Sequence, residues 1–419
     1  MEKIKVVWIC SMSNSAIRER LKFYKWTPMA ILRRLMNRMQ TYDLHIWNSN
    51  GIEIFEKFED CELHIISPHD YLSSVQEFTI NNVHYHFINN IKDCFLDFIN
   101  RSVFKKVRTD FSRNAKLINK IVEKINPDIV HVIGAENPEY SQAAINAKKD
   151  IPMIVSLQTL LADPIFLKNR PWFKDKEAYR VETEAEVLKC ADYIGTKSEH
   201  FRTIIRKKIA PDAKFLDMVL AVGEDVSISN NEKEYDFVYF AKDISKAVDY
   251  AIEAFALAVA EHSKITLHIV GGYSGGYIEP LKARIKELGI EQLVDFTGKL
   301  ETHDDVINEI EKARFALLPV KADLVSGTIR EAMAHGIPVV TTITPATPKL
   351  NEERESILLS EKGDFKAMAD NMCRLLTEEG LADRLQKNAA ETVKERYSND
   401  AVMKQWRKCY YDVLASKNN

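Results

Sequence analysis

Short apolar runs alternate with helical patterns along almost the whole chain, and this alternation most restricts the folds open to it. Each run has the length of a strand and ends at Gly, Pro or polar residues, whereas the stretches between runs repeat apolar residues with a helical period. Such alternation is typical of parallel sheets covered by helices. We therefore expect an α/β protein built from doubly wound parallel sheets.

The expected elements fall into two series. In the first half, strands are expected at residues 4–10, 63–67, 127–133, 152–157 and 193–196. In the second half, strands are expected at 237–240, 265–270, 293–296, 315–319 and 338–341, and helices at 247–261, 279–288 and 304–313. Two series of strands predict two sheets.

Length also predicts two domains, because single cores stop growing beyond about 250–300 residues and this chain has 419. The segment 223–234 is polar and aperiodic, as linkers are. We expect a first domain over 1–220, a second over 221–400, and a last helix over 401–419 that crosses back to the first domain. Ligands of doubly wound sheets bind at the carboxyl ends of strands.

Composition narrows the class of protein. With 46% hydrophobic and 28% charged residues the chain is of globular type. We find no apolar run of about 18 residues that would span a membrane, and the apolar N-terminal run is too short for a signal peptide. Six scattered cysteines without a Cys-x-x-Cys pair fit a reducing compartment and disfavour a zinc or disulfide framework. We expect a cytoplasmic protein.

Charge is unevenly distributed. Residues 1–215 hold 33 Lys and Arg against 27 Asp and Glu, whereas residues 216–419 hold 25 against 34. Residues 17–40 and 101–120 each carry seven basic residues and one acid, and aromatic residues are interspersed in the first of them. A basic amphipathic segment binds anionic membrane surfaces, so peripheral attachment to the cytoplasmic membrane face is one reading. A solvated basic face is the other. No nucleic-acid recognition motif accompanies these residues, and the total charge is negative.

The stretch 317–340 is the most informative. A strand is expected to end at Pro319, a Ser326-Gly327-Thr328 turn follows, and a helix runs on towards Gly336. Free backbone N–H groups at such a helix start bind phosphate. Asp323 and Glu331, with seven residues between them, would suit sugar or ribose hydroxyls. An ordinary strand-to-helix turn with a helix-start charge explains the same pattern.

The tail of this stretch, Glu331-Ala-Met-Ala-His-Gly-Ile-Pro-Val-Val, resembles the signature of family-four retaining glycosyltransferases (glycosyl transferases group 1). In that signature a first acid precedes Glu331 by eight positions, and here it is Asp323. Segments 267–273, 294–300 and 313–319 also resemble the family, in order, and the similarity covers about 235–400. It implies the GT-B fold, with two Rossmann-like doubly wound domains facing a central cleft.

The resemblance also implies a nucleotide-sugar donor held by the second domain. Lys246, Asp323 and Glu331 are the expected catalytic residues, with Glu331 on the ribose and lysines on the diphosphate. The expected donor-binding residues are Lys242, Lys246, Gly298, Lys299, Leu300, Asp323, Ser326, Gly327, Thr328 and Glu331. The chain has no Asp-x-Asp motif, so no metal and no cofactor are expected.

The first domain resembles the family only weakly and would hold the acceptor, a glycan or a lipid-linked molecule. Asn14, Glu136 and Gln158 are the candidate acceptor contacts. Gln158 stands where the family often has His, and ordinary turn polarity explains Glu136 equally well. Two rival functions remain at this stage. One is a sugar-nucleotide epimerase of the same fold, and the other is a catalytically silent protein that binds sugars or a partner.

Overall fold

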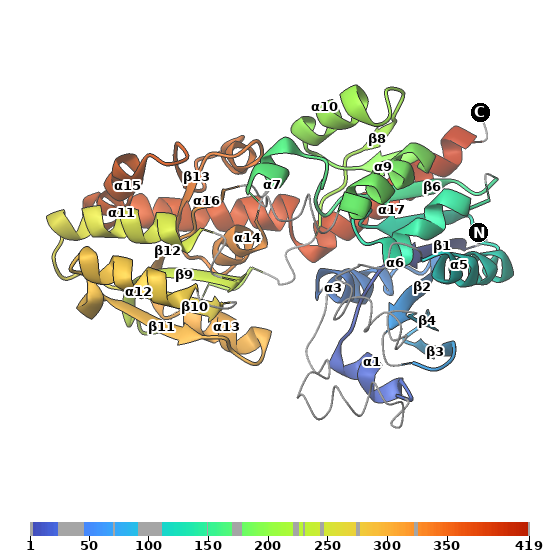
Figure 1. Ribbon diagram of the computed structural model, residues 1–419, viewed down its shortest axis with the longest axis horizontal. Helices are drawn as coiled ribbons and strands as arrows, with labels where there is room; N and C mark the ends of the chain where they lie inside the picture. Colours follow the sequence, from blue (N-terminus) through green and yellow to red (C-terminus); the bar gives the residue numbers. More distant parts are fainter. Residues whose placement is uncertain are drawn as a thin grey trace. The chain divides into compact units, whose positions relative to one another are not determined.

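The computed structural model describes residues 3–23, 46–69, 72–90, 111–148, 150–169, 178–220, 226–228, 231–243, 247–273, 277–321 and 326–417. The chain divides into two compact units, shown in Figure 1. The first unit comprises Met1–Ala221 and Val402–Asn419, and the second comprises Val222–Ala401. Each unit is built around one sheet.

The first unit contains an eight-stranded sheet in the order β3-β4-β2-β1-β5-β6-β7-β8. Among the strands that the structure describes in this unit, only β3 runs antiparallel to its neighbour, β4. The strands are β1 (Ile4–Ile9), β2 (Cys61–His69), β3 (Gln76–Ile80), β4 (Val83–Asn89), β5 (Ile129–Ile133), β6 (Met153–Ser156), β7 (Tyr193–Gly195) and β8 (Phe215–Leu216). β1 pairs with β2 on one side and β5 on the other, so the winding direction reverses at β1.

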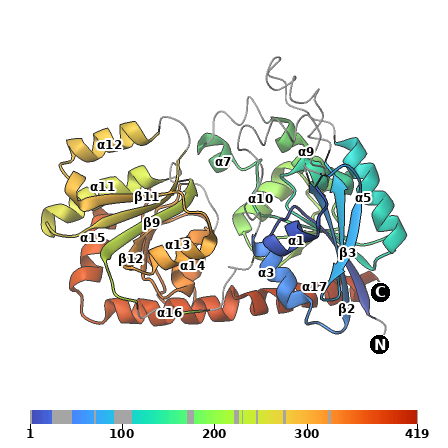
Figure 2. The ribbon, with the colours of Figure 1, turned by 90° about the horizontal axis from the view of Figure 1, so that it is seen from below.

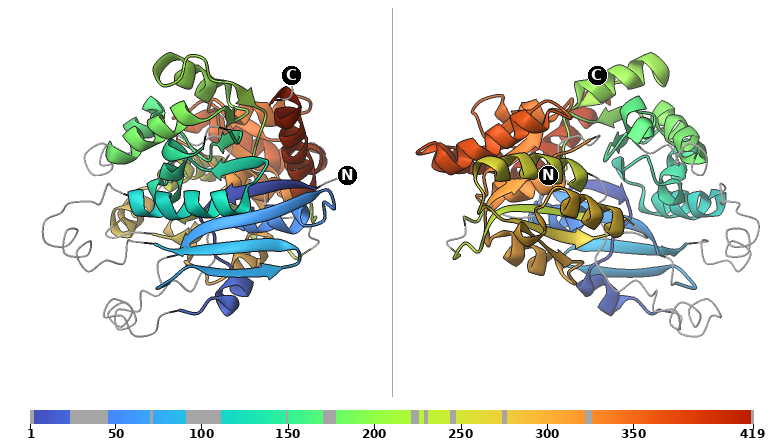
Figure 3. Two further views of the ribbon diagram at one scale, coloured as in Figure 1. Left: turned by 90° about the vertical axis from the view of Figure 1, so that its right-hand side faces the viewer. Right: turned by 60° about the vertical axis from the view of Figure 1, so that its left-hand side comes forward.

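Helices cover both faces of this sheet. They are α1 (Ser15–Arg20), α3 (Ile46–Phe55), α5 (Ser112–Ile125), α6 (Pro138–Ser141), η2 (Gln142–Asn146), α7 (Pro164–Asn169), α9 (Ala178–Cys190), α10 (Glu199–Lys208) and α17 (Asn399–Lys417). The left view of Figure 3 shows α5 in teal beside the blue strands of this unit. One core combines β1, α3 and α17 through Trp8, Phe55, Trp406 and Tyr410.

A buried polar contact fixes the end of α17 within this unit. Trp8 Nε1 donates to Tyr410 Oη over 2.9 Å, and Tyr410 Oη lies 2.7 Å from His131 Nδ1. Burial lowers the pKa of His131 to about 3, so the ring is neutral and Nδ1 accepts the tyrosine proton. The final helix is therefore tied to strands at the other end of the sequence.

The second unit contains a six-stranded parallel sheet in the order β11-β10-β9-β12-β13-β14. Its strands are β9 (Tyr235–Asp243), β10 (Leu267–Gly272), β11 (Val294–Gly298), β12 (Ala313–Leu317), β13 (Val339–Thr342) and β14 (Leu358–Ser360). Its helices are α11 (Val248–Glu261), α12 (Ile278–Glu287), η4 (Glu291–Leu293), α13 (His303–Ile310), α14 (Gly327–Ala334), η5 (Thr347–Asn351), α15 (Phe365–Thr377) and α16 (Leu381–Arg396). Right-handed crossovers place α11 and α12 on one face and α13 and α14 on the other, as Figure 2 shows.

The α/β class predicted from the sequence is confirmed, and every expected strand is present with shifted ends. The helix expected over 304–313 was wrong at its C-terminus, because α13 stops at Ile310 and Ala313 already opens β12. The β3–β4 hairpin was missed. Its turn is Asn81-Asn82, with φ of +47° and +66°, the left-handed conformation that two-residue hairpin turns require.

None of the helices in the described part of the chain combines the length and apolar character needed to cross a bilayer.

Candidate active site

The second unit changes winding direction between β9 and β12, which pair with each other at the centre of the sheet. Doubly wound sheets bind ligands at such a point, outside the carboxyl ends of the strands. Lys242 is the last residue but one of β9, and the loop after β12 leads to α14. Lys246 and Asp323 lie outside the described residues, as does the side chain of Lys242. The ends of β9 and β12, which precede the two sequence motifs expected at the donor, therefore lie side by side at one edge of the sheet.

The start of α14 is open towards this edge. Ser326 is its N-cap residue, yet the Ser326 side chain makes no capping hydrogen bond and instead lies 2.8 Å from Thr328 Oγ1. Gly327 is exposed, and a Cβ added there would meet nothing within 4 Å. First-turn amides of a helix carry partial positive charge and bind phosphate. The structure thus places Ser326, Gly327 and Thr328 together at a helix start, where the sequence predicts phosphate binding.

Glu331 lies in the second turn of α14 and is half-buried. Its neighbour Arg330 is buried at 8% exposure, with its guanidinium 5.5 Å from the centre of the Tyr397 ring. Burial lowers the pKa of Arg330, while the charges of Tyr397 and Glu331 oppose that shift. Arg330 therefore packs on the buried side of α14, whereas Glu331 lies on its partly exposed side.

Threonine hydroxyls anchor the segment that leaves β12. Thr341 Oγ1 donates to the Leu318 carbonyl over 2.6 Å, and Thr342 Oγ1 donates to the Val320 carbonyl over 2.6 Å. The Val320 amide lies 2.9 Å from the same Thr342 oxygen. These bonds fix the backbone immediately before the loop that carries Asp323.

Lys321 was not singled out from the sequence, although it lies within the informative stretch. Its Nζ contacts both carboxylate oxygens of Asp249 at 2.7 Å and lies 4.6 Å from the centre of the Tyr250 ring. Asp249 is in the first turn of α11, directly after the loop that holds Lys246. The ion pair therefore joins the first turn of α11 to the segment after β12. A lysine four residues after the end of β12 was the signal for it in the sequence.

Gly298 is the last residue of β11, which lies two strands away from β9, and Lys299 and Leu300 follow it. Gly298 has a φ of +78°, and a Cβ added there would meet nothing within 4 Å. Lys299 is exposed and Leu300 is half-buried. These residues lie at the same carboxyl edge as α14 but further from the switch point.

The first unit has its own switch point, between β1 and β5. Asn14 follows β1 and caps α1, because its Oδ1 accepts from the Ile17 amide over 2.9 Å and its Nδ2 donates to Ser49 Oγ over 3.2 Å. Glu136 follows β5 and Gln158 follows β6. Gln158 Nε2 donates to the Ile133 carbonyl over 3.3 Å. All three predicted acceptor residues lie at the carboxyl edge, and Asn14 is already occupied as a cap.

Glu136 is the most unusual of these residues. It is 6% exposed, its Oε1 accepts from Asn137 Nδ2 over 3.2 Å, and its buried Oε2 has no hydrogen-bond partner within the described structure. Burial raises the pKa of Glu136 to about 7, while its own backbone amide and the charge of Arg180 oppose that shift. A carboxyl with a pKa near neutrality at a strand end is a candidate for proton exchange with a ligand.

Gly134 and Glu184 help to fix the backbone segments near Glu136. Gly134 has a φ of +94°, and a Cβ there would lie 2.8 Å from Tyr140 Oη and 2.9 Å from both Glu136 carboxylate oxygens. Only glycine therefore permits the approach of Glu136. Glu184, which sequence reasoning missed, accepts from the Leu161 and Ala162 amides at 3.0 and 3.1 Å and so fixes the loop that follows Gln158.

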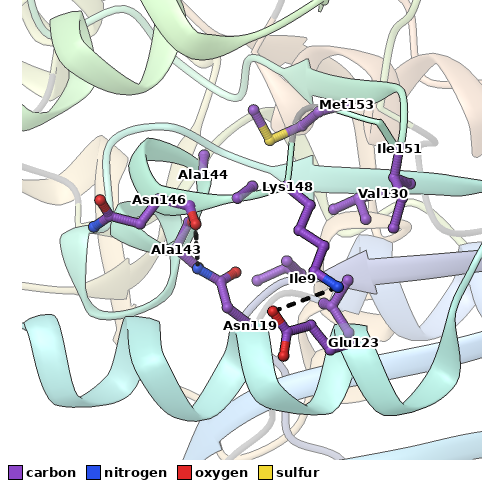
Figure 4. Close-up of a pocket in the computed structure, with 12 residues that line it drawn as sticks. Ile9, Asn119, Glu123, Val130, Ala143, Ala144, Asn146, Lys148, Ile151 and Met153 are labelled. Atoms are coloured by element: carbon purple, nitrogen blue, oxygen red, sulfur yellow. Dashed lines mark hydrogen bonds and ion pairs between the residues drawn. The ribbon is translucent and has the colours of Figure 1, made fainter.

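Figure 4 shows a small pocket of this unit, bordered by α5 and the amino ends of β5 and β6. Asn119 and Glu123 point into it from α5, and Lys148 reaches Glu123 over 3.7 Å. Its volume of about 30 Å³ holds one or two water molecules, too little for a sugar. It also lies at the opposite ends of these strands from Glu136, so it is not the acceptor site.

Comparison with known proteins agrees with this geometry. Residues 235–378, which contain the β9–β12 switch point and α14, match the family of glycosyl transferases group 1. N-acetyl-alpha-D-glucosaminyl L-malate synthase from Bacillus anthracis is 25% identical over 327 residues, which are 76% of this chain and 83% of that protein.

Solved structures show the same fold. Sucrose-phosphate synthase from Thermosynechococcus elongatus has a TM-score of 0.68 at 15% identity, covering 99% of this chain and 100% of that one. The S. aureus protein TarM, solved with alpha-GlcNAc-glycerol and UDP, has a TM-score of 0.54 at 18% identity, covering 71% of this chain and 58% of that one. The chain is therefore an α/β enzyme of the glycosyltransferase class with the GT-B fold. Within that class, residues 235–378 match glycosyl transferases group 1, the family that this part of the sequence resembles.

Proposed function

We propose that the protein transfers a hexosyl group from a nucleoside-diphosphate sugar to a hydroxyl of a glycan or lipid-linked acceptor, with retention of configuration and without a metal. The observation that carries the proposal is the group 1 match over 235–378, which coincides with the β9–β12 switch point and the open start of α14. Sugar transfer to polysaccharide or a related glycan fits this class.

In the proposed reaction the donor diphosphate binds the amides around Gly327 together with Lys242 and Lys246. These cations would stabilise the charge that develops on the leaving diphosphate, in place of a metal. Glu331 would accept hydrogen bonds from the ribose hydroxyls, and Asp323 from the sugar. Most of the acceleration would come from positioning and charge stabilisation.

The relatives suggest which donor to test first. The name of the Bacillus anthracis relative contains N-acetylglucosaminyl, and the TarM structure contains UDP and a GlcNAc-glycerol. We infer that UDP-N-acetylglucosamine is the first candidate donor for this chain. GDP-, ADP- and dTDP-sugars are the alternatives in the same assay.

On the acceptor side we propose that Glu136 contacts the acceptor hydroxyl. Its raised pKa and the lack of a hydrogen-bond partner for Oε2 support this role. The acceptor hydroxyl would donate to the carboxylate as it attacks the sugar. Gln158, at the end of the next strand, would add a hydrogen bond to the acceptor or the sugar.

Donor binding is tested by the melting temperature of the purified protein with each nucleotide sugar, without metal. Ligand that binds only the folded state raises the melting temperature. We expect one nucleotide to give a shift that Glu331→Gln reduces strongly. The matched control is Glu279→Gln, an exposed carboxylate at the first turn of α12 in the same unit, which should keep the full shift.

Transfer itself is tested by donor consumption with and without glycan acceptors. Consumption that needs an acceptor and is lost in Glu331→Gln and Lys246→Ala supports the proposal. Release of free nucleotide without any acceptor would indicate an epimerase instead. Donor binding with no consumption would indicate a silent sugar-binding protein. Full turnover in both variants would contradict the donor site.

A further inference from the structure

A cluster of histidines and carboxylates lies on the α5-covered face of the first sheet. His64 on β2 is the register partner of His84 on β4, and Glu62 lies two residues before His64 on the same face. The facing rings of His64 and His84 stack with centroids 4.6 Å apart. One potential ligand atom from each of these three residues lies within 4.8 Å of the other two. His86 and Glu77 extend the cluster on β4 and β3.

Hydrogen bonds connect four of these side chains in a row. Glu62 Oε1 lies 2.8 Å from His64 Nε2, His64 Nδ1 lies 3.2 Å from His86 Nε2, and His86 Nδ1 lies 3.0 Å from Glu77 Oε1. Three contacts need three protons, but two neutral imidazoles carry only two. Either one ring is charged or one contact brings two lone pairs face to face.

The surroundings disfavour a charged ring. His64 and His86 are 8% and 9% exposed, and such burial disfavours a charged group. Lys5 and Lys124 add positive charge beside the two carboxylates, and Lys124 Nζ lies 3.4 Å from Glu77. With both rings neutral, one of the three contacts lacks a proton, so two lone pairs face each other. A cation bound between them would remove this repulsion.

We propose that Glu62, His64 and His84 bind a divalent transition-metal ion of the zinc type. Two imidazoles and one carboxylate are a common zinc donor set, with a fourth position for water. Nitrogen ligands favour zinc over magnesium or calcium. Ligand atoms about 2.0–2.1 Å from a tetrahedral zinc stand roughly 3.4 Å apart. Glu62 Oε1 and His64 Nε2 would therefore move slightly apart from 2.8 Å, and His84 would come to a similar separation from within 4.8 Å.

The neighbouring residues are arranged to orient the ligands. Thr79 Oγ1 lies 3.0 Å from His84 Nδ1, which leaves the other ring nitrogen of His84 for the ion. His64 would donate from Nδ1 to His86, and His86 from Nδ1 to Glu77, leaving His64 Nε2 for the ion. Metal-binding histidines are held in this way by hydrogen-bond acceptors. The ion would link β2 to β4 in the amino-terminal halves of these strands, away from Glu136, so its role is structural.

The test uses the full chain, stripped of metal by a chelator and dialysed, with Zn²⁺ titrated against a chromophoric competitor. We expect one tight site and a rise in melting temperature with Zn²⁺. Glu62→Gln and His84→Ala should remove the site. Glu77→Gln should weaken binding about 10–100-fold, as outer-shell changes do. Glu62→Gln is nearly isosteric and its side chain is 35% exposed, so it decides the matter if His84→Ala does not fold.

The matched control is His262→Ala. His262, Glu261 and Cys373 form a second group of close ligand-type side chains in the other unit. Zinc affinity should be unchanged in this variant. No saturable binding by the wild type, affinity unchanged in Glu62→Gln, or loss in His262→Ala alone would overturn the proposal.

Discussion

Glu136 combines a buried position with the carboxyl edge of a strand, so its protonation state depends on its surroundings. Its pKa is raised to about 7 because burial disfavours the charged form. If the carboxylate contacts the acceptor hydroxyl, kcat/KM should rise as pH increases through about 7. Glu136→Gln should lower activity and remove this rise. Activity in Glu136→Gln with the wild-type pH profile would contradict the role.

The same carboxyl group should make the folding stability fall as pH rises, opposite to the expected rise in kcat/KM. A raised pKa means that the folded protein binds the proton more tightly than the unfolded chain. The stabilisation is complete below pH 4.5, the ordinary carboxyl value, and is lost as pH rises through about 7. The loss is about 3 kcal/mol, at about 1.4 kcal/mol per pKa unit. Melting temperatures between pH 5 and 8 should therefore fall less in Glu136→Gln than in the wild type.

At the scale of elements, α14 joins the donor turn to β13 and must end sharply. Gly336 ends it with a φ of +68°, and Gln386 Nε2 donates to the Gly336 carbonyl over 2.8 Å. A Cβ there would lie 3.0 Å from Gln386 Nε2 and 3.1 Å from Ile228 Cγ1. We expect Gly336→Ala to suffer both left-handed strain and overpacking. Each costs on the order of 1–3 kcal/mol.

Gly289, after α12, is a matched control for this change. It has the same φ of +68°, but a Cβ there would meet nothing within 4 Å. Gly289→Ala should lose only the strain of about 1–2 kcal/mol. Comparing the free energies of unfolding of the two variants in urea separates the cost of left-handed strain from the cost of overpacking. An equal loss of stability in both would mean that Gln386 and Ile228 give way without cost.

At the scale of the whole molecule, the uneven charge suggests contact with an anionic surface. The segment 17–40 is the proposed membrane-binding part, and its residues 24–40 lie outside the described residues. In its described start Ile17 is buried, whereas Arg20 and Lys22 are exposed. We expect the protein to pellet with phosphatidylcholine vesicles only when they contain phosphatidylserine. Binding should weaken as salt shortens the screening length to about 10 Å at 0.1 M. The triple substitution Arg33→Glu, Arg34→Glu and Arg38→Glu should abolish pelleting with these vesicles.

A charge-matched control is available in the same unit. Lys207, Lys208 and Lys214 are exposed on or near α10 and lie outside the proposed segment in the sequence. Changing these three to Glu alters net charge equally and should leave pelleting intact. Equal loss in both triple variants would indicate attraction by net charge alone, and no pelleting of the wild type would remove the membrane proposal.

The sequence by itself determined the α/β class, the positions of the main strands and the group 1 signature around Glu331. These features are local, because strand-length apolar runs, helix periods and a contiguous motif are all written within short stretches. The β3–β4 hairpin was not predicted because Asn81-Asn82 is a weaker turn signal than Asn-Gly. The roles of Lys246, Asp323 and Glu331 stay predictions from the resemblance.

Only the tertiary structure decided which distant residues meet. The Lys321–Asp249 pair, the buried environment that raises the pKa of Glu136, and the Glu62–His64–His84 cluster each join elements far apart in the sequence. Parallel sheets pair strands through long crossovers, so the register that places His64 beside His84 is not encoded in either strand alone. Burial, which raises the pKa of Glu136, is likewise a property of the packed molecule and not of the local sequence.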